Sequence, residues 1–162
     1  IVISSPTLFS TSFAAAILVT CVISFHIIPK NLERGLPVFR LFTWYEIVMH
    51  NGNVALLGAS LLINGMQVEW KFIAFPVVFG IAYVAWAAIY ANFISGVFIY
   101  DFMDYRLQGA PLIYLGLLSL QATFFLVVLG LDRLAETSSV LGALAIMAMT
   151  WMIIRIRDPS HG

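Results

Sequence analysis

The sequence predicts an all-α membrane protein, a polytopic bundle of about five transmembrane helices forming a single integral membrane domain over residues 1–162. Composition is the first observation behind this prediction. Hydrophobic residues make up 62% of the chain, charged residues make up 10%, and the mean hydropathy is +0.99. Soluble domains carry roughly 25% charged residues, so this composition excludes an ordinary soluble enzyme. The 8 basic residues only balance the 8 acidic ones, and a nucleic-acid binder needs a basic excess.

The spacing of the charged residues is the second observation. Asp, Glu, Lys and Arg are all absent from 1–29, 47–68, 72–100, 107–131 and 137–154. A helix needs about 20 apolar residues to cross the hydrocarbon core. The runs are continuously apolar, which favours helices over the alternating pattern of a membrane barrel. We therefore expect spans at Phe9–Ile28, Tyr45–Ile63, Phe72–Asn92, Leu112–Leu131 and Ser138–Ile154.

Turn-forming and capping residues lie between these runs. Pro29 is expected to end the first helix, because proline has no backbone N–H and its ring crowds the preceding turn. The later boundaries are marked by Pro37, by Asn64-Gly65, by Gln108-Gly109-Ala110-Pro111 and by Thr137 or Ser138 as a cap. Close helix approach is expected at Gly58, Gly80, Gly96, Gly116 and Gly130.

Basic residues predict the orientation of the bundle. With five spans, one side receives Lys30, Arg34, Arg40, Arg106, Arg155 and Arg157, and the other receives Lys71 and Arg133. The positive-inside rule then places the first side, with the C-terminus, in the cytosol, stroma or matrix.

The second predicted span carries the most polar side chains. Glu46, His50, Asn53, Ser60 and Asn64 recur at helical spacing and are expected to share one face. Glu46 and His50 are four residues apart, so the carboxylate can orient the imidazole. Three interpretations of His50 remain open: a packing hydrogen bond to a neighbouring helix, a general base or acid, and a haem or metal ligand.

Three other polar residues have alternative roles. His26 ends the first span on the side where His50 begins the second, and two histidines at matching depth are what bis-His haem ligation needs. Asp101 belongs either to an interfacial loop or to the site, where it would orient His50 or bind a lipid headgroup. Gln121, alone in the fourth span, is expected to form a hydrogen bond between helices.

Short motifs beginning at Met49-His50 follow one another over roughly residues 45–131. Asn53 lies three residues after the histidine, and Tyr83 and Trp86 are three apart on the next helix. The later motifs are Ser95-Gly96-Val97-Phe98-Ile99-Tyr100-Asp101-Phe102, Gly109-Ala110-Pro111 and Leu129-Gly130. In order and spacing the chain resembles the androgen-induced / androgen-dependent TFPI-regulating protein family, which are transmembrane threonine hydrolases that cleave fatty acid esters of hydroxy fatty acids.

The resemblance implies that His50 is the catalytic histidine. Glu46, Asn53 and Asp101 are the candidate supporting residues, and they come from the spacing and position of the polar residues rather than from the resemblance. Asn53, one turn from His50, is a candidate oxyanion donor. The family's nucleophilic threonine lies on an earlier helix that has no counterpart here, and the family's proline is Asp101. The available threonines outside that motif are Thr11, Thr20 and Thr43. The expectation is a relative that is truncated or inactive as a lipid hydrolase, with the nucleophile unknown and the assignment as an enzyme left open.

Two alternatives stand beside this one. The chain is alternatively a non-catalytic accessory subunit of a large respiratory or photosynthetic complex, which its small size and missing nucleophile favour. It is alternatively a membrane cytochrome that binds haem through His26 and His50. The expected partners are membrane lipids and other membrane subunits, without nucleic acid. No metal or cofactor is assigned, and GxSxG, HExxH, CxxC and phosphate-loop motifs are absent.

Overall fold

The structure, a computed structural model, describes residues 5–65 and 67–156. Three long helices each contain a wider π-helical turn, and two more helices are regular. The order is α1 (Ser5–Val22), η1 (Ile23–Ile27), α2 (Ile28–Glu33), η2 (Phe39–Phe42), α3 (Trp44–Ile47), η3 (Val48–Gly52), α4 (Asn53–Asn64), η4 (Trp70–Phe72), α5 (Ala74–Tyr90), η5 (Ala91–Ser95), η6 (Asp101–Met103), α6 (Ala110–Thr137) and α7 (Ser139–Ile153). The described chain is therefore all-α, as the sequence predicts.

Four continuous helices are long and apolar enough to cross a membrane. They are Ser5–Glu33, Trp44–Asn64, Trp70–Ser95 and Ala110–Thr137. The fifth, α7, has 15 residues. At a rise of 1.5 Å per residue it is about 22 Å long, which is less than a hydrocarbon core of roughly 30 Å. The protein is an integral membrane helical bundle, with α7 as a shorter apolar helix beside the four.

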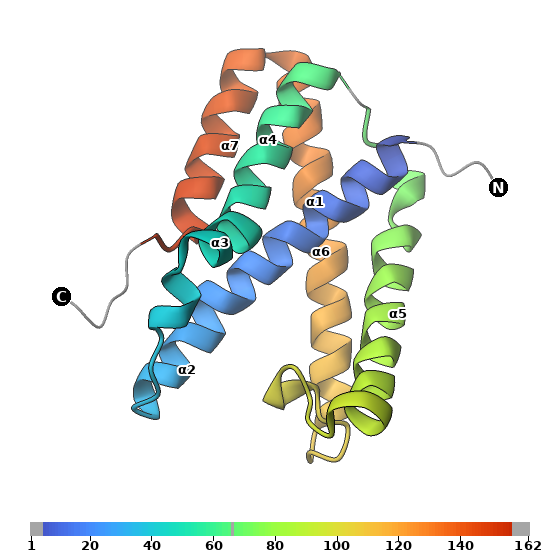
Figure 1. The fold of residues 1–162 in the computed structure, drawn as a ribbon. Helices are drawn as coiled ribbons and strands as arrows, with labels where there is room; N and C mark the ends of the chain where they lie inside the picture. Colours follow the sequence, from blue (N-terminus) through green and yellow to red (C-terminus); the bar gives the residue numbers. More distant parts are fainter. Residues whose placement is uncertain (1–4, 66, 157–162) are drawn as a thin grey trace.

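The helix α1 runs obliquely across the bundle and organises its core (Figure 1). It packs against α6, α4 and α5, while α6 also contacts α5 and α7. Phe13 and Ile17 of α1 lie against Val54 of α4 and against Phe125 and Val128 of α6, and all five side chains are buried. This apolar cluster holds the upper part of the bundle together.

The prediction that Pro29 ends the first helix is wrong, because the helix continues to Glu33. The turn before the proline widens instead: the Ile28 N–H donates to the Ile23 carbonyl, five residues back. A π turn of this kind moves the preceding carbonyl groups away from the proline ring. The helix can then continue although proline has no N–H to donate. A local change of helix type thus replaces a helix end.

The other predicted boundaries are confirmed. Gly65 ends α4 in a left-handed conformation, with φ of 55°. Gly109, with φ of 88°, precedes α6, and Pro111 lies in the first turn of that helix. The Ser138 side chain caps α7 by accepting a hydrogen bond from the Leu141 N–H.

Close helix packing involves only some of the predicted glycines. A Cβ at Gly58 would meet Ile146 and one at Gly80 would meet Leu118, whereas one at Gly116 or Gly130 would meet nothing within 4 Å. Gly96 lies in a turn, with φ of 74°, rather than at a helix contact. At Gly142, which the sequence pattern does not single out, an added Cβ would meet backbone atoms of Ala135.

The connection between α4 and α5 is attached to α6 by Asp132. This carboxylate is 5% exposed, and its Oδ2 accepts a hydrogen bond of 2.8 Å from the N–H of Val68, which is fully buried. Asp132 directly follows the charge-free run 107–131, but sequence alone gives no sign that its partner is a loop amide.

We expect Asp132→Ala to lower the free energy of unfolding by about 1–3 kcal/mol, because it leaves the buried Val68 N–H without an acceptor. Asp132→Asn keeps an oxygen at that position and should remain near wild type. Thermal unfolding in detergent micelles compares the two variants. An asparagine variant as unstable as the alanine variant would contradict the proposed contact.

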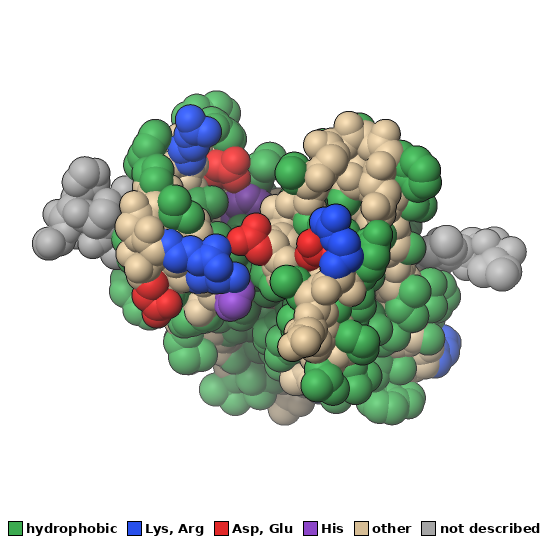
Figure 2. Space-filling view, turned by 90° about the horizontal axis from the view of Figure 1, so that it is seen from below, with side chains coloured by type: hydrophobic (Ala, Val, Ile, Leu, Met, Phe, Trp, Pro, Cys, Tyr) green, Lys and Arg blue, Asp and Glu red, His purple; other side chains and the backbone are tan. Residues whose placement is uncertain are grey.

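Most charged side chains gather at one end of the bundle. In the view from below, basic, acidic and histidine side chains cluster near the end of α2 and the α5–α6 connection, ringed by hydrophobic side chains (Figure 2). Arg34 pairs with Asp101 at 3.0 Å and Arg106 with Asp104 at 2.8 Å. The opposite end carries the Lys71–Glu69 and Arg133–Glu136 pairs. Arg157 lies outside the described residues.

Candidate functional site

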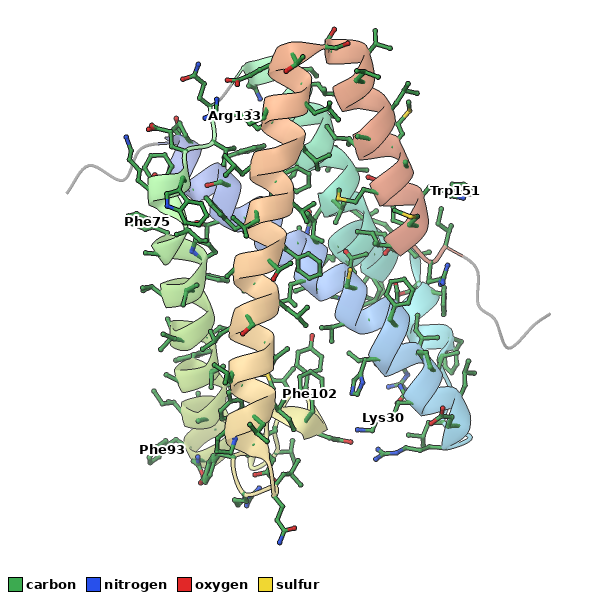
Figure 3. The ribbon with its side chains drawn as sticks, turned by 180° about the vertical axis from the view of Figure 1, so that it is seen from behind. Lys30, Phe75, Phe93, Phe102, Arg133 and Trp151 are labelled. Carbon is green, nitrogen blue, oxygen red and sulfur yellow. The ribbon has the colours of Figure 1, made fainter. Side chains whose placement is uncertain are left out.

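An apolar cavity of about 740 Å³ lies between the helices and is partly open to the surroundings. Side chains from α1, η3, α4, α5 and α6 line it, and the η6 segment contributes Phe102 and Met103. Phe102 lies between α6 and the α1–α2 helix (Figure 3). The polar side chains in the lining are Ser12, His50, Asn53, Ser60, Tyr83, Tyr100 and Gln121. A cavity of this size and character suits a lipid or another small apolar ligand.

The Glu46–His50 pair is the most reactive group at this cavity. The His50 Nε2 lies 2.7 Å from the Glu46 Oε2, and the two side chains are 22% and 24% exposed. A carboxylate can only accept, so Nε2 carries a hydrogen in this contact, and in the neutral ring Nδ1 is the nitrogen with the lone pair. The predicted carboxylate–imidazole pair is therefore present, with one ring nitrogen left to act as a base.

The backbone around His50 is a π turn, η3, which is tied to the first helix. Thr20, fully buried on α1, donates its hydroxyl hydrogen to the His50 carbonyl. The Asn51 side chain donates to the Arg155 carbonyl at 2.8 Å, which joins the same turn to the end of α7. π turns inside α-helices frequently mark functional sites, and here two neighbouring helices fix the turn.

The predicted polar stripe is present for His50, Asn53 and Ser60, which share the cavity wall with Leu57. Glu46 joins them through its contact with His50. Asn64 does not line this cavity: it is the last residue of α4 and is exposed. The Asn53 amide donates to the Met49 carbonyl of its own helix, so part of its donor capacity is already used.

Tyr100 is another polar residue of the cavity lining. In the sequence it is noted only as part of the Ser95–Phe102 motif, without a role of its own. Its ring stacks on Phe102, with centroids 5.4 Å apart and planes at 10°. Burial raises the pKa of the Tyr100 phenol, and the nearby Tyr83 and Glu46 raise it further. The phenol therefore stays protonated at neutral pH and can donate a hydrogen bond inside the cavity.

Gln121 does not form the predicted hydrogen bond between helices. It is 2% exposed, and among the described residues neither its Nε2 nor its Oε1 has a hydrogen-bond partner. The side chain instead forms part of the cavity wall. A single glutamine in an apolar run identifies a buried amide, but not which groups surround it.

None of the three candidate threonines is hydrogen-bonded to the His50 ring in the described residues. The Thr20 hydroxyl is used on the His50 carbonyl, and that of Thr43 on the Arg40 carbonyl. The Thr11 hydroxyl is buried without a partner and does not line the cavity. Ser12 does line the cavity, and no sequence pattern indicates this, because an isolated serine near a helix start is usual.

Asp101 does not orient His50 as proposed from the sequence. Its carboxylate is 72% exposed and pairs with Arg34 at 3.0 Å, which links the α5–α6 connection to the end of the first helix. Glu46 takes the orienting role instead. Asp101 lines a second cavity of about 710 Å³, together with Lys30, Arg34 and Arg106.

His26 and His50 line different cavities. His26 belongs to the second cavity, where its ring meets Phe102 edge-on with centroids 5.2 Å apart. Within residues 5–65 and 67–156, no three histidine, cysteine, aspartate or glutamate side chains converge as metal ligands would.

Comparisons of the chain with protein families, with curated proteins and with solved structures found no match. The arrangement itself defines a class of site: an acid–base pair at the wall of an apolar cavity within a membrane helical bundle.

Proposed function

We propose that this protein binds an acyl lipid in the membrane and acts on its ester bond, as a relative of the transmembrane lipid-ester hydrolases that it resembles. The observation that carries the proposal is the Glu46–His50 contact of 2.7 Å at the wall of an apolar cavity of about 740 Å³. A lipid chain would occupy the space between the apolar walls, and its ester group would lie beside the imidazole of His50.

The chemistry follows from the groups present. His50 takes the proton from an attacking hydroxyl or water through Nδ1, while Glu46 stabilises the imidazolium that forms. The Tyr100 phenol is a donor for the developing oxyanion. The imidazolium then returns the proton to the leaving alcohol. With water as the attacking group, the products are a carboxylic acid and an alcohol; with a hydroxyl of the protein, the first products are an acyl-enzyme ester and the alcohol, and a water activated in the same way then releases the carboxylic acid. Because no described threonine is hydrogen-bonded to the His50 ring, the attacking group is left as water or another hydroxyl.

The two alternatives from the sequence draw less support. The His50 Nε2 is occupied by Glu46, and His26 faces another cavity, which does not favour ligation of one haem by both rings. An accessory subunit would pack its exposed apolar helix faces against partner subunits. Lipid contact requires the same apolar faces of any membrane bundle, so these faces do not favour an accessory subunit.

We also infer that the end carrying the second cavity faces the cytosol, stroma or matrix. Lys30, Arg34 and Arg106 line that cavity, whereas the basic residues at the opposite end are, within the described part of the chain, Lys71 and Arg133. This distribution supports the orientation given by the positive-inside rule.

An ester-cleavage assay with a chain-length series tests the proposed function. We expect purified protein in lipid nanodiscs to hydrolyse nitrophenyl esters of long fatty acids. Ala16 lines the cavity, so Ala16→Trp should fill the space that a long chain needs. The expected loss in kcat/KM for long-chain esters is about tenfold or more, with short-chain esters much less affected.

Ala85→Trp is the matched control, because Ala85 is exposed on α5 and does not line the cavity. It should keep the wild-type preference for chain length. Absence of ester cleavage by the wild-type protein, or equal losses in the two tryptophan variants, would contradict the proposal.

A further inference from the structure

The second cavity, at the charged end of the bundle, has a lining with more basic than acidic side chains. Its volume is about 710 Å³, and its lysine, arginine and aspartate residues are Lys30, Arg34, Asp101, Asp104 and Arg106. In the view from below, basic side chains lie on both sides of this end, with acidic and histidine side chains between them (Figure 2). The ester chemistry proposed above uses none of these charged groups.

Two of the three basic side chains have hydrogen-bond donors that no carboxylate occupies. Arg106 is committed to Asp104 by a two-point contact, in which its Nε donates to Oδ1 at 2.8 Å and its Nη2 donates to Oδ2 at 2.9 Å. Arg34 donates from one nitrogen only, Nη1, to the Asp101 Oδ2 at 3.0 Å. Among the side chains that the structure describes, Lys30 forms no ion pair. A lysine has three N–H donors and an arginine has five, so Lys30 and Arg34 keep donors for a ligand.

Lys30 and Arg34 reach the cavity from the same helix end. They are four residues apart, and Arg34 directly follows the last residue of α2, so the two side chains leave the helix on the same face. Lys30 is half-buried and the Arg34 side chain is 50% exposed. Since both line the cavity and neither is fully buried, a ligand in the cavity can contact both.

A phosphate group matches these donors better than a carboxylate does. A phosphate monoester has three terminal oxygens and a charge of about −1.5 to −2, whereas a carboxylate has two oxygens and a single charge. Val97 and Leu107, which are 68% and 46% exposed, add apolar surface to the same lining. Basic pockets between transmembrane helices bind the headgroups of anionic lipids, which need both kinds of surface.

We propose that the second cavity binds a phosphate group through Lys30 and Arg34, with a phospholipid headgroup or a soluble phosphate as its source. Asp101 then competes with the phosphate for Arg34, because its carboxylate already accepts from that guanidinium. This site goes beyond the proposed function. It involves neither ester cleavage nor the Glu46–His50 pair, so either proposal can fail while the other stands.

Displacement of a labelled lipid tests the proposal. Phosphatidic acid with a fluorophore on one acyl chain is bound to the protein in uncharged detergent micelles. Dioleoylphosphatidic acid and dioleoylglycerol compete as probes that differ only in the phosphate, and oleic acid offers a carboxylate instead. Dioleoylphosphatidic acid should compete about tenfold better than the other two, the ratio that one charge-assisted hydrogen bond gives. Inorganic phosphate distinguishes the sources: competition by it supports a soluble phosphate as ligand, and its failure to compete supports a lipid headgroup.

Three variants locate the site. Lys30→Gln should weaken binding of the labelled phosphatidic acid about fivefold, the contribution of one basic residue near a membrane surface. Arg40→Gln is the matched control, because it removes the same charge shortly after α2 but Arg40 does not line the cavity. It should change the affinity by less than about twofold. Asp101→Asn should tighten binding, because it releases Arg34, and the variant should fold, since an exposed ion pair contributes little to stability.

Four results would overturn the inference. They are a failure of the wild-type protein to bind labelled phosphatidic acid, equal competition by the lipids with and without phosphate, equal losses in Lys30→Gln and Arg40→Gln, and unchanged affinity in Asp101→Asn. None of these results bears on ester cleavage, which the chain-length assay tests separately.

Discussion

A His50→Gln variant is expected to lose about 10²–10⁴-fold in the rate of ester cleavage, the range that removal of a general base produces. Glutamine retains a group that can face Glu46, but it has no nitrogen that takes up a proton at neutral pH. The backbone contact from Thr20 goes to the carbonyl of residue 50, so the substitution leaves it in place. The variant should therefore fold and still bind long-chain ligands while turning over poorly, and steady-state kinetics beside displacement of a fluorescent fatty acid separate these effects.

Glu46→Gln is the graded control for this prediction. The amide oxygen can still accept from the His50 Nε2, so the tautomer is kept, but the negative charge that stabilises the imidazolium is lost. Loss of such an orienting partner costs about 10–100-fold. We expect activities in the order wild type, Glu46→Gln, His50→Gln. Full activity in His50→Gln would remove the base from the mechanism, and loss of ligand binding in both variants would assign the pair a structural role.

The helical fold could be predicted from the sequence because the membrane imposes simple rules on composition. Five charge-free runs locate five helices, since charge is costly in hydrocarbon. Gly109, Pro111 and Ser138 act locally, and their turn and capping roles follow from their own backbone chemistry. Pro29 does not end its helix, because the wider turn η1 before it accommodates the proline ring. The residue type alone does not indicate whether a helix ends at a proline or widens before it.

The candidate site was predictable only where its residues lie within one helical turn. Glu46 and His50 are four apart, so their contact follows from helix geometry. The partner of Asp101 is Arg34, 67 residues away, and the burial of Gln121 beside a cavity depends on how α1 and α6 cross. Such contacts depend on how the helices pack against one another. The spacing of hydrophobic residues along a single sequence predicts the helices but not their packing.

The second large effect is expected at Gly142, where α6 and α7 come closest. A Cβ built on Gly142 would lie 2.6 Å from the Ala135 Cα and 3.1 Å from its backbone nitrogen. Backbone atoms of a packed helix cannot move aside as a flexible side chain can. The short turn at Ser138 also prevents the two helices from sliding apart. Gly142→Ala should therefore lower the free energy of unfolding by about 1–3 kcal/mol, the cost of overpacking.

Gly116→Ala on α6 is the matched control, because its added methyl would meet nothing within 4 Å. Alanine is favoured over glycine in a helix by up to about 1 kcal/mol, so this variant should be as stable as wild type or more stable. For a chain of this size, 1 kcal/mol corresponds to about 2–4 °C in Tm. Thermal unfolding in one detergent should therefore separate the two alanine variants by several degrees. Equal Tm values for the two variants would contradict the close contact between α6 and α7 at Gly142.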